Sequence, residues 1–118
     1  MNEITAILDK FLVKSKSSAA FIVNGKAKIV SSLNVEHAES MAAMSAAIIS
    51  MCVKFLDDFN HGVLQQFYIK AGNGIVIANQ INNSNFIVVF APTGGNLALL
   101  MRSADEVAAE FSTNKLIK

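Results

Sequence analysis

The sequence predicts an α/β protein of the α+β kind: three layers, a five-stranded antiparallel sheet, and the element order αββαβββα. Three observations lead to this prediction. Apolar residues recur at helical spacing in three stretches, short turns rich in Asn and Gly separate five strand-like runs, and one of those runs is apolar throughout. With 118 residues, the chain is expected to form a single domain, 1–118, long enough to bury a core.

The first part of the chain predicts a helix followed by a hairpin. Apolar residues recur at helical spacing from Ile4 to Leu12, so a short helix should run to about Lys14. The stretch SAAFIVNGKAKIVSSL has the pattern of two strands around Asn24-Gly25. Asn-Gly suits a type I′ turn, in which both central residues have positive φ.

A long second helix is expected next, capped by Asn34 or the residues just after it and ending near Asp58 or Phe59. It includes MAAMSAAIISMCVKFL, in which Lys54 is the one charged residue. On a helical wheel centred on Ser45, the residues within about 80° form a face for packing on the sheet. They are Met41, Ala42, Ile48, Ile49, Cys52, Phe55, Leu56 and Phe59.

A second apolar strip adjoins that face, made of Met44, Ala47 and Met51, with Ser40 at the same angle. Small residues allow close helix approach, and Met adapts to irregular partner surfaces. We expect the same helix of a second copy to cover the strip across a two-fold axis. The alternative is that loops or the sheet edge of the same chain cover it.

The rest of the chain predicts three strands and a third helix. GVLQQFYIKAGNGIVIANQ has the pattern of two strands joined at Asn73-Gly74, and NFIVVFAP, ended by Pro92, that of a central strand buried on both faces. TGGN should form a strand-to-helix turn with a helix cap. The third helix then keeps the helical period through Leu97, Leu100, Met101, Ala104, Val107, Ala108 and Phe111.

The two expected edge strands differ in character. The strand KAKIVSS opens with Lys26 and Lys28, which guard an edge against pairing with other chains. The strand VLQQFYIK is long and has one charge, at its end, so at a sheet edge it would invite pairing.

Composition excludes several classes of function. The net charge is +1 without a basic block, and there is no Trp, so the electrostatic footprint of a nucleic-acid binder is missing. The uncharged stretches are too short or too interrupted to predict a membrane span, and MNEITAILDKFLVK does not resemble a signal peptide. A single cysteine, Cys52, fits a reducing compartment. A soluble, cytoplasmic protein is therefore expected.

No residue pattern indicates catalysis, a cofactor or a metal site. His37 and His61 belong to opposite ends of the second helix and cannot share a site within one chain. Asp57, Asp58 and His61 could hold a metal, although a solvated helix end is the favoured interpretation. Cys52 falls on the core face of the wheel and is expected to be an inert thiol. The sequence thus predicts a protein that is not an enzyme.

Three segments in this order carry a resemblance: the hairpin AAFIVNGKAKIVSS, the Ala-rich helix, and FYIKAGNGIVIANQ followed by NFIVVFAP. The chain resembles the roadblock family, the small dimeric domains related to dynein roadblock light chains and to bacterial gliding-motility GTPase regulators. The resemblance implies a homodimer in which two sheets join through their third strands and the second helices pack antiparallel. By position, it places Met44, Ala47, Met51, Gln65, Phe67 and Ile69 in or near the dimer interface.

The resemblance also implies the function that we expect. Such dimers serve as platforms for Ras-like small GTPases or other adaptors, so the leading hypothesis is a non-enzymatic homodimeric scaffold that binds a Ras-like small GTPase. One alternative is a small-ligand sensor of the PAS or GAF type, which needs an internal cavity with converging polar groups. Another is a structural adaptor that binds a peptide or another roadblock-like protein.

Overall fold

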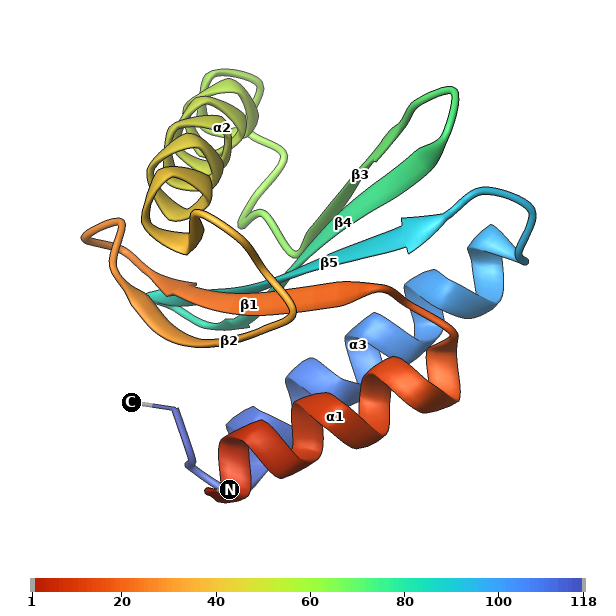
Figure 1. The fold of residues 1–118 in the computed structure, drawn as a ribbon. Coiled ribbons are helices and arrows are strands. Elements are labelled where there is room, and N and C mark those ends of the chain that lie inside the picture. The colour runs from red at the N-terminus through yellow and green to blue at the C-terminus, as the bar shows by residue number, and fades with distance from the viewer. Residues whose placement is uncertain (1, 118) are drawn as a thin grey trace.

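The computed structural model describes residues 2–117, and its elements follow the predicted order αββαβββα (Figure 1). The helices and strands are α1 (Glu3–Ser15), β1 (Ala19–Asn24), β2 (Ile29–Leu33), α2 (Ala38–Asp58), β3 (Gln66–Lys70), β4 (Gly74–Asn82), β5 (Asn85–Pro92) and α3 (Leu97–Thr113).

The five strands form one sheet in the order β2-β1-β5-β4-β3, and all neighbours are antiparallel. The apolar strand β5 lies at the centre, as its sequence predicts. β2 and β3 are the two edge strands, as expected. In the register across the sheet, Val88 is opposite both Phe21 and Ala78, and Ala78 is opposite Phe67. These four side chains form a row on one face of the sheet.

The three predicted layers are present (Figure 1). α1 and α3 cover one face, where Leu8 and Phe111, both fully buried, pack with Ile22 and Ile87 of the sheet. α2 lies on the other face, above the cluster that contains Phe21. The sheet is therefore apolar on both sides, which explains why β5 has no polar–apolar alternation.

Side-chain caps define the starts of α1 and α3. The Oδ1 atom of Asn2 accepts a hydrogen bond from the backbone N–H of Thr5 at 2.8 Å. Asn96 does the same for Leu99 at 3.1 Å, so the capped turn predicted for TGGN is confirmed. Gly94 has φ 99° in this turn, a conformation that residues with a side chain rarely adopt.

The type I′ turn predicted for Asn24-Gly25 is wrong, because neither residue has positive φ. The strands predicted to join at Asn73-Gly74 are present as β3 and β4, and β4 already begins at Gly74. In the β1–β2 turn, Oδ1 of Asn24 accepts from the N–H groups of Lys26 and Lys28, and Ala27 takes the left-handed conformation at φ 61°. The Asn side chain thus organises a longer loop.

Two boundaries also differ from expectation. α2 begins at Ala38, after His37, which has φ 54° and makes no capping hydrogen bond through its side chain. Asn34 does not cap the helix, since its Nδ2 atom donates to the carbonyl oxygen of Ser18 at 3.3 Å. β3 begins at Gln66 rather than Val63, and Leu64 instead inserts into the core ahead of the strand, at 6% exposure.

Candidate protein-binding surface

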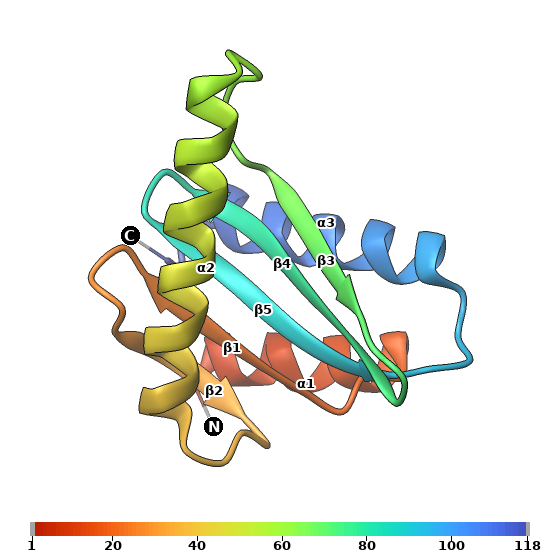
Figure 2. The same cartoon turned by 90° about the horizontal axis from the view of Figure 1, so that it is seen from above.

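α2 is attached to the sheet along a narrow face. Ala42 is its one fully buried residue, while Met41, Ile49 and Leu56 are half-buried against the same cluster. Its main contacts are with β1 and β2, so it lies over one half of the sheet (Figure 2). Most of the apolar circumference of α2 is consequently not covered by its own chain.

The core face predicted for α2 is therefore partly wrong. Ile48, Phe55 and Phe59 were expected to pack on the sheet, yet they are 39%, 64% and 60% exposed. Met44 and Met51, expected on the adjoining strip, are 54% and 73% exposed. Together these five residues (Met44, Ile48, Met51, Phe55 and Phe59) form one continuous row on the helix, which we call the α2 stripe.

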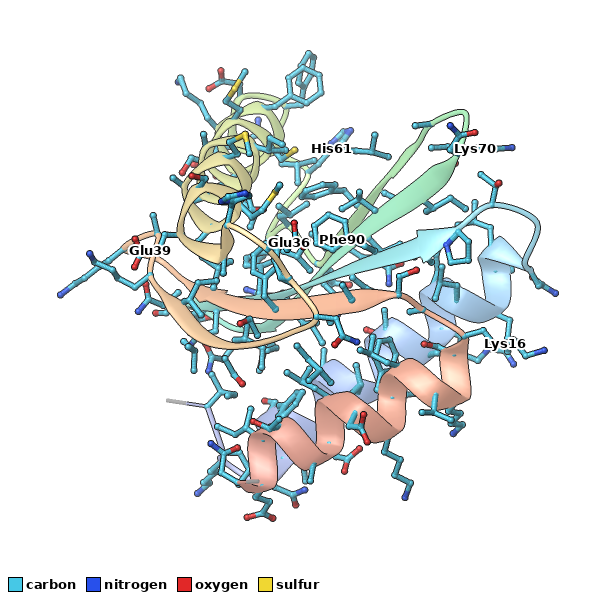
Figure 3. All side chains as sticks on the ribbon, in the orientation of Figure 1. Lys16, Glu36, Glu39, His61, Lys70 and Phe90 are labelled. Carbon is cyan, nitrogen blue, oxygen red and sulfur yellow. The ribbon has the colours of Figure 1, made fainter. Side chains whose placement is uncertain are left out.

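The α2 stripe faces the same side of the molecule as β3. Glu39 and Ile48 are nine residues apart, which at about 100° per residue places them on opposite flanks of the helix. Figure 3 shows Glu39 on the flank that points away from β3. The α2 stripe, on the flank of Ile48, is therefore directed toward the β3 side and outward.

β3 provides the second part of the surface. One of its edges pairs with β4, and no other strand within residues 2–117 pairs with the other edge. Phe67 is half-buried in the cluster beneath α2, whereas Ile69, two residues further on, is 43% exposed. The outer edge of β3 therefore has backbone N–H and C=O groups that no described strand pairs with, next to apolar side chains. This combination favours pairing with another strand.

A polar network fixes the start of β3. The Nε2 atom of Gln66 donates to Oδ1 of Asn79 on β4 and, at 2.8 Å, to the carbonyl oxygen of Met101 on α3. Asn79 is 2% exposed, and its Nδ2 atom donates to the carbonyl oxygen of Gln80 at 3.1 Å. These partly buried hydrogen bonds hold the edge strand in one position on α3.

The other interface residues expected from the sequence lie around this surface. Ser40 and Ala47 are exposed on α2. Gln65 is exposed and lies just before β3, although its carbonyl oxygen accepts from the N–H of Gln80 at 2.7 Å. Ile48, Phe55 and Phe59 were not predicted to lie on the surface. Together with Met44 and Met51 they follow one another at spacings of three or four residues, which could have revealed one stripe.

The residues considered for chemistry do not form a site. Asp57, Asp58 and His61 are exposed, and within residues 2–117 no three His, Cys, Asp or Glu side chains lie close enough together to hold a metal ion. Cys52 is half-buried against the core beneath α2.

By length and composition alone, α2 could also cross a membrane. No such span was expected from the sequence, and only 6% of the apolar window is buried, unlike in a typical core helix. In this fold, α2 is held on the sheet by Ala42 and its half-buried neighbours.

The sequence matches no protein-family model and no curated protein, whereas the fold matches many solved structures. MglB of Myxococcus xanthus is similar with a TM-score of 0.91 at 13% identity, covering 98% of this chain and 97% of that one. An MglB described as having a tetrameric arrangement gives a TM-score of 0.85 at 9% identity, with 92% and 85% covered.

A roadblock/LC7 domain from Streptomyces avermitilis gives a TM-score of 0.83 at 12% identity, covering 95% of this chain and 97% of that domain. In all three, the match spans at least 92% of this chain. This chain therefore has the fold of the roadblock family, as the order and pattern of its sequence indicate.

Proposed function

We propose that this protein is a non-enzymatic, homodimeric scaffold that binds a Ras-like small GTPase in the cytoplasm. The observation that carries the proposal is the α2 stripe beside the open edge of β3. Five large apolar side chains in one row, each at least 39% exposed, would be unfavourable in water unless a partner covered them.

The stripe is suited to pairing with itself. If two α2 helices pack antiparallel about an axis at Met51, that residue meets Met51 of the partner subunit. Ile48 then meets the partner's Phe55, and Met44 meets the partner's Phe59. A two-fold interface must be self-complementary. Here the aliphatic residues at one end of the stripe would contact the aromatic residues at the opposite end of the partner's stripe. Because the α2 stripe is directed toward the β3 side, we infer that the same axis would bring the two β3 edges toward each other, so that strand pairing and helix packing would belong to one arrangement.

The GTPase part of the proposal is supported by the resemblance of the sequence to bacterial gliding-motility GTPase regulators and by the similarity of the fold to MglB. Such a platform would bind the mobile switch segments of the GTPase and shift their populations, without adding a catalytic side chain.

Two measurements test the two parts separately. Light scattering should give the mass of a dimer at micromolar concentration, and a monomer under these conditions would refute the self-association. Titration with a co-encoded Ras-like GTPase, loaded with GDP or a non-hydrolysable GTP analogue, should show binding that prefers one nucleotide. If neither form binds while a roadblock-like protein or peptide does, the adaptor hypothesis replaces the GTPase scaffold. Release of phosphate from GTP by the dimer alone would contradict its assignment as a non-enzyme.

A further inference from the structure

A cavity on the opposite side of the sheet from α2 has the composition of a small-ligand site. It has a volume of about 520 Å³ and lies between the end of α1, the end of β5 and the first turns of α3. Cavities that bind small ligands typically measure about 300–1,000 Å³ and are mostly apolar, with a few polar groups at defined positions.

The floor of this cavity is part of the core. Ile75, Ala91 and Leu100 line it and are 6%, 7% and 9% exposed. They belong to a cluster between the sheet and α3 that also contains the half-buried Leu97. The floor is thus the edge of the core, and Leu99, which is 56% exposed, adds an open apolar side chain to the lining.

The rim of the cavity is positively charged. Lys14 and Lys16, from the end of α1, line it beside Ser15 and Ser103, and the lining contains no acidic residue among those described (Figure 3 labels Lys16). Within residues 2–117 the single ion pair is that between Lys54 and Asp58, so neither of the two rim lysines has a carboxylate within 4.0 Å. Neither ammonium group is paired within these residues, so both can contact an anion, and the acidic residues that share a hollow with Lys14, Glu106 and Glu110, lie outside this cavity.

We propose that this cavity binds a small amphipathic carboxylate, such as a medium-chain fatty acid. Its apolar chain would cover the floor formed by Ile75, Ala91 and Leu100, and its carboxylate would lie between Lys14 and Lys16. The two lysines disfavour an amine head group, and a neutral ligand would leave their charges without a counterion. Because the α2 stripe lies on the other face, this site is independent of the proposed dimer.

Decanoate is a suitable probe, with methyl NMR as the readout. We expect saturable shifts in the methyl signals of Ile75, Leu97 and Leu100, and none at Ile48 or Ile49 of α2. Acetate has the head group without the chain, and decanol has the chain without the charge, so both should bind more weakly. Shifts confined to Ile48 and Ile49 would mean that decanoate coats the α2 stripe, which would overturn the proposal.

The double variant Lys14→Gln/Lys16→Gln tests the head-group contacts. Both residues are exposed, so the fold should persist, and decanoate should bind roughly fivefold more weakly because two surface ion pairs are lost. The matched control, Lys26→Gln/Lys28→Gln, removes the same charge in the β1–β2 turn and should leave the affinity unchanged. Equal affinity in both double variants, or no saturable binding by the unmodified protein, would refute the site.

Discussion

Phe55 and Phe59 lie edge to face on the outside of α2, with ring centroids 5.0 Å apart and an angle of 64° between the ring planes. Such aromatic pairs usually contribute to a core or an interface, where each ring removes a large apolar area from water. Here both rings are mostly exposed. The pair therefore gives the end of α2 a preformed apolar surface, and it is the part of the α2 stripe with the largest side chains.

Replacing Met51 by Asp should convert the proposed dimer into a monomer. Met51 is 73% exposed in the single chain, so the variant should fold, but the dimer would have to bury two unpaired carboxylates at its axis. Light scattering measures the change in mass. Ser50→Asp adds the same charge on the other flank of α2 and should remain dimeric. A dimeric Met51→Asp variant would show that Met51 lies outside the interface.

Replacing Phe55 by Ala should lower the free energy of unfolding of the monomer only slightly, but it should weaken the proposed dimer strongly. In the Met51→Asp background, we expect the free energy of unfolding to fall by about 1 kcal/mol or less, because most of the ring is already in water. Phe111→Ala, at a fully buried position, should cost about 3–5 kcal/mol. Denaturant titration compares the two, and similar losses would mean that Phe55 belongs to the core.

A cysteine at position 51 should cross-link the proposed dimer. In a Cys52→Ser background, Met51→Cys places two thiols on the two-fold axis, where the Cα atoms can reach the roughly 4.4–6.8 Å that a disulfide needs. Mild oxidation should give a covalent dimer on a non-reducing gel. Met44→Cys in the same background should cross-link poorly, because Met44 faces the partner's Phe59. The reverse order of efficiencies would exclude this register.

Loss of the Asn79 side chain should loosen β3. Asn79→Ala removes the acceptor for Gln66 at a buried position, so we expect a loss of about 1–3 kcal/mol in the free energy of unfolding. Hydrogen exchange should accelerate most at residues 66–70. If exchange rose equally in β1, which is remote from this network, the effect would be global and Asn79 would have no special role in positioning the edge strand.

The sequence was most informative where a pattern had one interpretation. The apolar run of β5, with no alternation and with Pro92 at its end, is typical of a strand covered on both faces. The seven apolar positions of α3 define a single face, and five of them are buried: Leu100, Ala104, Val107, Ala108 and Phe111. The lysines at the start of the second strand predicted an edge, and β2 occupies one.

The orientation of α2 could not be predicted in the same way. Because α2 is apolar around most of its circumference, a wheel centred on Ser45 and one rotated toward Ile49 fit the pattern almost equally well. The small side chain of Ala42 decides between them, since it allows the helix to approach the sheet closely, and it is the residue that is fully buried. The large rings of Phe55 and Phe59 are thereby turned outward.

Local turn geometry was equally hard to predict, because Asn favours several turns. Its side chain tolerates the left-handed conformation of a type I′ turn, but it also accepts hydrogen bonds from N–H groups further along the chain. Asn24 does the latter with Lys26 and Lys28, and the positive φ moves to Ala27. The sequence alone does not show which of these two roles the Asn residue takes.

The unequal edges of the sheet limit how far assembly can proceed. Both edge strands have five residues, but the register of β2 with β1 shifts between Ile22 and Val23, and lysines stand before β2. β3 keeps a regular register with β4, and its one charged residue, Lys70, lies at its end. A subunit with one edge strand that favours pairing can form a dimer that adds no further copies. A subunit with two such edges could add copies indefinitely and form a fibre. Among the described strands, β3 is the single edge that favours pairing, so edge-to-edge growth would stop at two copies.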